Sequence, residues 1–262
     1  MNCGTLNHES AKFCMGCGHS LKAKSEQPKD VNGCASAHSG FDGDQVQTRI
    51  DEVKNFNTQM TQVWNHQPVT HCNLIELLLL VLDISGSMDG QFDRDMNKLQ
   101  AANRAQRGLV LQKMSNDSND EIGIVTFNHE AHCRVKLGPI HAISPQVLNT
   151  LQSLRAGGGT AQHEGLAMAE KNFEWHRENV LRRIVLLTDG HGGDPVPVAE
   201  RLKSRGVVID VVGVGHDPSA VNEPELKQTA SVIQGESHYF FIKNYNTLVE
   251  TFTHLSNKTN IY

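Results

Sequence analysis

The chain has 262 residues, of which 38% are hydrophobic and 20% are charged, and its formal net charge at pH 7 is −5. This length accommodates one α/β domain of ordinary size and a small additional unit. The net negative charge argues against a general polyanion-binding protein. The apolar runs fall short of the ~18–20 residues of a membrane-spanning helix. The first residues lack a basic segment followed by an apolar one, so we expect a cytoplasmic protein without membrane attachment.

Residues 1–21 form a first unit that contains Cys3, Cys14 and Cys17. Cys14, Cys17 and Gly18 have the C-x-x-C-G pattern of a zinc knuckle, in which the glycine allows backbone amides to turn toward the thiolates. In a protein without a secretory signal, such cysteines are typically metal ligands rather than disulfide partners. The segment resembles the short zinc ribbon that opens many bacterial multidomain proteins, which implies that the three cysteines bind Zn²⁺.

This zinc-ribbon pattern is incomplete, because the first C-x-x-C pair, which would include Cys3, would need another cysteine just before Met1. Three explanations stay open. The chain starts further upstream, or His8, His19 or the terminal amine supplies the fourth ligand, or the segment binds no metal and its cysteines are surface thiols. A zinc analysis of the full-length protein would show whether about one Zn²⁺ is bound per chain.

Two segments connect this unit to the rest of the chain. Residues 22–43 are rich in Lys, Ser, Pro, Gly, Asn and Asp, which predicts a flexible linker. Residues 44–67 place apolar side chains three or four positions apart, which predicts an amphipathic helix that ends before Pro68. This apolar stripe either packs on the following domain or binds a partner protein. The stripe consists of Val46, Ile50, Val53, Phe56, Met60, Val63 and Trp64.

Residues 73–262 alternate between strand-like and helix-like patterns, which predicts an α/β domain. Right-handed crossovers then give a doubly wound, mostly parallel six-stranded sheet with helices on both faces. We expect strands at residues 74–82, 121–127, 134–137, 183–187, 207–214 and 238–242. We expect helices at residues 92–113, 145–154, 164–178, 195–204, 223–231 and 245–257.

Two details of this domain bear on its surface. Residues 134–137 follow the strand at 121–127 after a connection too short for a crossover, which predicts an antiparallel edge strand. A basic run along the helix at 92–113 is typical of a solvated helix face. The basic run consists of Lys98, Arg104, Arg107 and Lys113.

The first part of the chain lacks the positive charge of a nucleic-acid-binding unit. Residues 1–72 carry six Lys and Arg against seven Asp and Glu, which argues against nucleic-acid binding by the first unit.

Oxygen-bearing side chains follow two strands and one loop of the predicted domain. In an open α/β sheet, ligands bind at the carboxyl ends of strands where the strand order reverses, so we expect these side chains to converge there. Carboxylate and hydroxyl oxygens without a neighbouring base or thiol favour a hard divalent cation such as Mg²⁺. The residues are Asp83, Ser85 and Ser87 after the first strand, Thr160 after three glycines, and Asp189 after the strand at 183–187.

These three segments together match the metal-ion-dependent adhesion site of von Willebrand factor A domains, and the domain from residue 73 onward resembles that family. The resemblance implies that Ser85 and Ser87 bind the cation through their hydroxyls, and that Thr160 binds it directly or through a water. It also implies that Asp83 and Asp189 hold coordinating waters and orient the serine hydroxyls. Mg²⁺ is the expected ion, with Mn²⁺ or Ca²⁺ as alternatives.

The resemblance implies a non-catalytic, Mg²⁺-dependent protein-binding module, an adaptor or scaffold, in which a partner's Glu or Asp completes the metal coordination. Neutral hydroxyl ligands leave the charge of the cation under-compensated, so an acidic side chain from outside complements it. Bacterial intracellular members accompany MoxR-type or magnesium-chelatase-type ATPases, kinases or phosphatases, and these are the partner classes we expect. The alternative is a metal-dependent hydrolase in which His163 or His191 activates a bound water.

Overall fold

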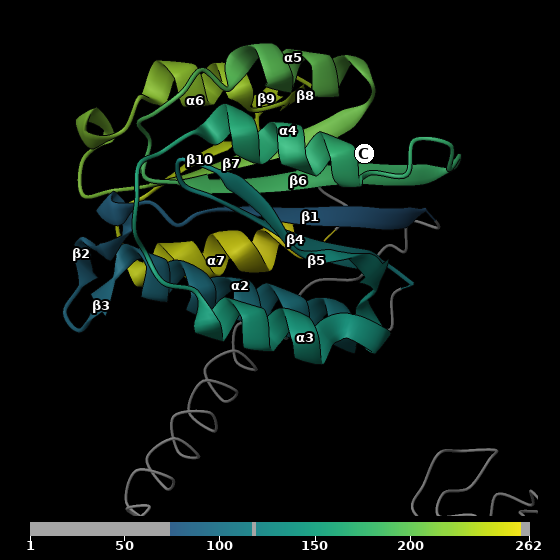
Figure 1. Ribbon diagram of the computed structural model, residues 1–262, viewed down its shortest axis with the longest axis horizontal. Helices are drawn as coiled ribbons and strands as arrows, with labels where there is room; N and C mark the ends of the chain where they lie inside the picture. Colours follow the sequence, from purple (N-terminus) through teal and green to yellow (C-terminus); the bar gives the residue numbers. More distant parts are fainter. Residues whose placement is uncertain (1–73, 117–118, 258–262) are drawn as a thin grey trace, which may run out of the picture. The chain divides into compact units, whose positions relative to one another are not determined.

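The computed structural model describes residues 74–116 and 119–257. Its centre is a six-stranded sheet with the strand order β10-β7-β6-β1-β4-β5 (Figure 1). Neighbouring strands are parallel except for the antiparallel pair β4 and β5, which confirms the mostly parallel sheet and its antiparallel edge strand. The strands are β1 (Ile75–Asp83), β4 (Glu121–Phe127), β5 (Ala131–Pro139), β6 (Val180–Thr188), β7 (Val207–Val214) and β10 (Tyr239–Ile242).

The predictions for the first part of the chain lie outside the described residues. They comprise the linker at 22–43, the amphipathic helix at 44–67, and the zinc ribbon at 1–21 with Cys3, Cys14 and Cys17. These stay predictions. Across residues 74–116 and 119–257, no helix has the length and apolar character needed to cross a bilayer.

Helices cover both faces of the sheet (Figure 1). They pack there because each helix turns an apolar side toward the strands, and the two resulting cores are separated by the sheet itself. One face carries α2 (Lys98–Ser115), α3 (Ile140–Ser153) and α7 (Tyr245–Leu255). The other face carries α4 (Gln162–Asn172), α5 (Val196–Ser204) and α6 (Glu223–Thr229).

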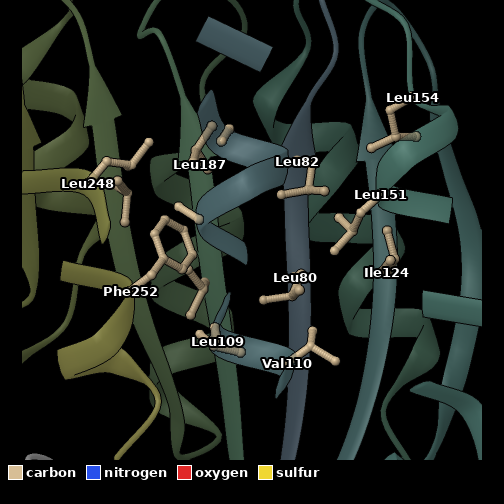
Figure 2. Packing of buried hydrophobic residues seen from close by; sticks show 14 of the residues in the cluster. Leu80, Leu82, Leu109, Val110, Ile124, Leu151, Leu154, Leu187, Leu248 and Phe252 are labelled. Atoms are coloured by element: carbon tan, nitrogen blue, oxygen red, sulfur yellow. The ribbon is translucent and has the colours of Figure 1, made fainter. Parts of the chain in front are cut away.

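The central strand β1 is apolar on both faces because helices cover it from both sides. Leu80 and Leu82 point into the core beneath α2, α3 and α7, whereas Leu79 and Val81 point into the core on the other side. Figure 2 shows Leu80 and Leu82 among side chains of α2, α3 and α7. Full burial of one such side chain contributes about 1.5–3 kcal/mol. The strand that ends at Asp83 is therefore held firmly in place.

The start of α2 differs from the prediction. The helix begins at Lys98 rather than at residue 92, because Gln91–Asp93 (β2) and Met96–Asn97 (β3) form a small antiparallel hairpin. The Asn97 side chain accepts a hydrogen bond of 2.7 Å from the amide of Gln100, and the Gln100 side chain accepts one of 3.0 Å from the amide of Asn97. This capping box satisfies amides of the first turn and sets the helix start.

Two other helix boundaries differ by five or six residues, and the remaining ones by at most two. α3 begins at Ile140 rather than at residue 145 and contains Pro145, so the proline does not mark the first turn. α4 ends at Asn172 rather than at residue 178. The remaining short elements are η1 (Gly86–Asp89), η2 (Pro218–Ala220), β8 (Val232–Ile233) and β9 (Glu236–Ser237).

The basic run of α2 is not a single solvated face, and the prediction was wrong at both of its ends. Lys113 has a side chain that is 2% exposed and forms ion pairs with Glu76 and Asp120. Lys98 forms an ion pair of 2.7 Å with Asp189. Charge patterning along one helix does not reveal these pairs, because their acidic partners belong to other elements of the fold.

Candidate metal centre

Asp83 is the last residue of β1, and its carboxylate is fully buried. One carboxylate oxygen accepts a hydrogen bond of 2.8 Å from the backbone amide of Ser85, and the other accepts one of 2.7 Å from Oγ1 of Thr188 at the end of β6. These donors are neutral, and burial raises the pKa of Asp83 from 3.8 to about 6 in spite of them. Among the residues that the structure describes, the hydrogen-bond donors to this buried carboxylate are thus neutral groups.

Ser85, Ser87 and Asp189 continue the hydrogen bonding across the site. The two serine Oγ atoms lie 3.0 Å apart, and Oγ of Ser87 donates to Oδ1 of Asp189 at 2.8 Å. Asp189 directly follows β6, which pairs with β1, so the two carboxylates come from adjacent strands as the sequence predicts. Four of the five predicted site residues are thus joined by hydrogen bonds.

The loop that carries Thr160 lies against both of these segments. The amide of Gly86, in the serine turn, donates to the carbonyl oxygen of Gly158 at 3.0 Å. Gly192, in the loop after Asp189, has a φ of +123°, and a Cβ added there would lie 2.4 Å from the carbonyl oxygen of Thr160. The fifth predicted residue is therefore held between the serine turn and the loop that follows β6.

Lys98 is a residue of this site that the sequence reading missed. Its Nζ lies 2.7 Å from Oδ2 of Asp189, and the two side chains are 17% and 5% exposed. Asp189 thus accepts from Ser87 with one oxygen and from the ammonium with the other. The basic run in the sequence contained the signal, but only the fold shows which carboxylate the lysine meets.

The two histidines of the hydrolase alternative lie beside the site. His191 is exposed, and His163 places Nε2 3.6 Å from a carboxylate oxygen of Glu164 in the first turn of α4. Within the described part of the chain, the hydrogen-bond partners of Asp83 and Asp189 are serine, threonine and lysine groups. A general base must reach its proton directly or through one water. These contacts therefore do not single out either histidine as that base.

The donor set of the site suits a hard divalent cation. It combines two carboxylates with hydroxyl groups, and Mg²⁺ and Ca²⁺ prefer oxygen donors of this kind. A cation bound here would compensate the buried charge of Asp83, whose hydrogen-bond donors are neutral. Among the residues that the structure describes, no three His, Cys, Asp or Glu side chains gather into a metal cluster.

The fold and this arrangement of residues can be compared with known families. A model of the von Willebrand factor type A domain matches residues 78–254, a range that contains Lys98 and the five predicted site residues. The chain belongs to the von Willebrand factor type A family. Domains of this family are commonly protein-interaction or adhesion modules, and they often bind a divalent metal at the metal-ion-dependent adhesion site.

Proteins similar to this von Willebrand factor A protein occur in distant organisms. Calcium-activated chloride channel regulator 1 of Bos taurus is 27% identical over an alignment 267 residues long, gaps included, that covers 96% of this chain and 26% of the bovine protein. An uncharacterised protein of Synechocystis is 28% identical over 183 residues, which cover 68% of this chain and 40% of that protein. The chain therefore spans well under two thirds of the length of these relatives.

Solved structures share the von Willebrand factor A fold. BatB from Bacteroides thetaiotaomicron aligns with a TM-score of 0.56 at 25% identity, and the alignment covers 70% of this chain and 95% of BatB. Proximal thread matrix protein 1 from the mussel byssus was solved with a zinc-occupied adhesion-site motif. It aligns with a TM-score of 0.57 at 23% identity, and the alignment covers 72% of this chain and 46% of the mussel chain. The likeness to the mussel protein concerns the fold alone.

Proposed function

We propose that this von Willebrand factor A domain is a non-catalytic, Mg²⁺-dependent protein-binding module that receives an acidic side chain of a partner. One observation carries the proposal. A hydrogen-bonded series joins Asp83, Ser85, Ser87 and Asp189 at the carboxyl ends of two adjacent strands. It gathers hydroxyl and carboxylate oxygens where open α/β sheets bind their ligands.

Each residue of the site has a distinct role in this proposal. Ser85 and Ser87 provide hydroxyl ligands, and Thr160 provides one directly or through a water; Gly158 of the same glycine-rich loop accepts a hydrogen bond from the amide of Gly86 in the serine turn. Asp83 and Asp189 accept hydrogen bonds from that turn and so orient it. A bound Mg²⁺ would supply an electrophilic centre for a carboxylate from outside the chain. The mussel protein's zinc-occupied motif makes Zn²⁺ a further ion to test, beside Mn²⁺ and Ca²⁺.

The chemistry of the ligands favours binding over turnover. Hydrolytic metals are usually held by directly bound histidines or carboxylates, whereas this pattern offers serine hydroxyls as direct ligands. Hydroxyl ligands leave positive charge at the site, and a partner's Glu or Asp would compensate it through a charge-assisted contact. The proposed partner is therefore a protein with an accessible acidic side chain. A MoxR-type ATPase, a kinase or a phosphatase of the same system would fit this description.

Co-purification with and without EDTA tests the proposal. The tagged full-length protein should recover a partner in Mg²⁺ buffer and lose it in EDTA, and the Ser87→Ala variant should lose it in both buffers. Ser204→Ala is the matched control, because the exposed Ser204 hydroxyl donates to the carbonyl oxygen of Arg201 at 2.8 Å within α5. Recovery that is unchanged by EDTA and by Ser87→Ala would refute the proposal.

The hydrolase alternative has its own direct test. A screen of phosphoesters with added Mg²⁺ should show no turnover above the rate without protein. Mg²⁺-dependent turnover that His191→Ala or His163→Ala abolishes would replace the binding proposal with the catalytic one.

A further inference from the structure

Lys98 places a positive charge beside the proposed metal site. Its Nζ donates to Oδ2 of Asp189 at 2.7 Å, while Oδ1 of the same carboxylate accepts from Ser87 at 2.8 Å. The Lys98 ammonium and the hydroxyl of Ser87, a proposed direct ligand of the cation, therefore donate to the two oxygens of the same Asp189 carboxylate. Among the described residues, Lys98 is the one lysine or arginine that forms an ion pair with Asp83 or Asp189.

The surrounding backbone determines where Lys98 lies. The residue directly follows the Asn97 cap, and Nδ2 of Asn97 donates to Oδ1 of Asp89 in η1 at 2.7 Å. The amide of Lys98 donates to the carbonyl oxygen of Gly90 at 3.0 Å, and a Cβ added to Gly90 would lie 3.9 Å from Nζ. The lysine side chain thus runs along this glycine and is 17% exposed. It differs from the freely solvated lysines of a helix surface, whose ion pairs contribute little.

Formal charges show what this ammonium does to the site. Asp83, Asp189 and Lys98 together carry a formal charge of −1, and a divalent cation changes the sum to +1. We propose that Lys98 weakens binding of the cation and strengthens binding of the acidic ligand, so that the loaded site keeps one positive charge for one carboxylate. The inference rests on the proposed function and adds a residue that is absent from the metal-ligand pattern.

A purely structural role for Lys98 predicts a different result. If the ion pair only holds Asp189 in place, its loss releases the loop after β6, and both the cation and the acidic ligand bind more weakly. If Lys98 acts through its charge, its loss removes repulsion between like charges, and the cation binds more tightly. The sign of the change in metal affinity therefore distinguishes the two roles.

Binding of Mn²⁺ to the full-length protein tests the inference, because electron paramagnetic resonance measures free Mn²⁺ without any partner present. We expect Lys98→Gln to bind Mn²⁺ about tenfold more tightly than the unmodified protein. With Mn²⁺ bound, Lys98→Gln should bind acetate about tenfold more weakly than the unmodified protein does. Acetate serves as the carboxylate probe, and the effect of the bound Mn²⁺ on water-proton relaxation measures its binding. Lys98→Arg keeps the charge and should stay within about threefold of the unmodified protein in both measurements.

The outcomes separate this inference from the proposed function. Mn²⁺ binding by Lys98→Gln that is unchanged or weaker would overturn the inference and leave the proposed function standing. Failure of the unmodified protein to bind Mn²⁺, Mg²⁺ or Zn²⁺ would overturn both. Thermal unfolding in EDTA checks that each variant folds. Lys98→Met, which keeps the side-chain length without the charge, carries the same prediction if the glutamine variant does not fold.

Discussion

The guanidinium of Arg183, in β6, donates a hydrogen bond of 2.9 Å to the carbonyl oxygen of Leu255, the last residue of α7. The same guanidinium lies 3.2 Å from a carboxylate oxygen of Glu76 on β1 and 2.5 Å from one of Asp210 on β7. All three charged side chains are completely buried. Arg183 therefore joins three strands and one helix. Glu76 lies near the start of β1, whereas Asp83 ends it, so this cluster is separate from the proposed metal site.

Replacing Arg183 with methionine would leave Asp210 and Glu76 buried without their guanidinium partner. Removing one member of a buried ion pair costs about 3–5 kcal/mol, because the remaining charge stays desolvated. We expect Arg183→Met to lower the free energy of unfolding by this amount in urea denaturation at neutral pH. Arg201→Met is the control, because the Arg201 side chain is 51% exposed and solvent screens its pair with Glu170, so that pair contributes little to stability. Equal small losses in the two variants would contradict the prediction.

Mg²⁺ binding should depend on pH in the range around the raised pKa of Asp83. Burial raises that pKa to about 6, so the cation must displace a proton at lower pH. We expect the apparent Mg²⁺ affinity to fall by about tenfold for each pH unit below 6 and to level off above it, as measured by calorimetry. Asp83→Asn should bind Mg²⁺ more weakly and without this pH dependence. A flat profile for the unmodified protein would show that Asp83 does not titrate with the metal.

The same pKa determines how the metal-free protein responds to pH. A carboxyl group whose pKa is higher in the folded state stabilises the fold below its unfolded pKa, and this contribution is lost as the pH rises through the folded pKa. For Asp83 this stabilisation is lost between pH 3.8 and about pH 6. In EDTA, thermal unfolding should therefore show the unmodified protein losing stability between these values relative to Asp83→Asn. Excess Mg²⁺ should reduce the difference at neutral pH, because the cation stabilises the ionised form.

Gly192 should influence metal affinity without being a ligand. Alanine at this position would bring Cβ to 2.4 Å from the carbonyl oxygen of Thr160, so the threonine loop would have to move. We expect Gly192→Ala to weaken Mg²⁺ binding by about tenfold or more, as is usual for residues that support metal ligands. Gly206→Ala is the control, because Gly206 has a φ of +77° and no atom within 4 Å of the added Cβ.

The control variant separates backbone strain from displacement of the loop. Both glycines have a positive φ, so both alanine variants lose about 1 kcal/mol or more of stability from the unfavourable backbone conformation. Gly206→Ala should nevertheless bind Mg²⁺ like the unmodified protein in calorimetry. Equal affinities in the two variants would contradict the part assigned to Gly192.

Strand positions and the starts of α6 and α7 could be predicted well from the sequence, whereas the starts of α2 and α3 could not. The strands at 121–127 and 207–214 coincide with β4 and β7, because buried parallel strands are short apolar runs between polar segments. The start of α2 was misjudged because Phe92 is buried and fits a helical spacing, although it belongs to the β2–β3 hairpin. An apolar residue shows that a position is buried, but not which element buries it.

The sequence by itself determined the order of strands and helices and the identity of the oxygen-bearing residues that the fold brings together around Asp83. Only the tertiary structure decided which charges meet. Lys98 meets Asp189 across 91 residues of chain, and Lys113 meets Glu76 across 37. Such pairs depend on distances in space, and the crossovers between strands determine those distances. Patterns in a short stretch of sequence carry no information about them. The raised pKa of Asp83 has the same origin, because burial by the surrounding fold causes it.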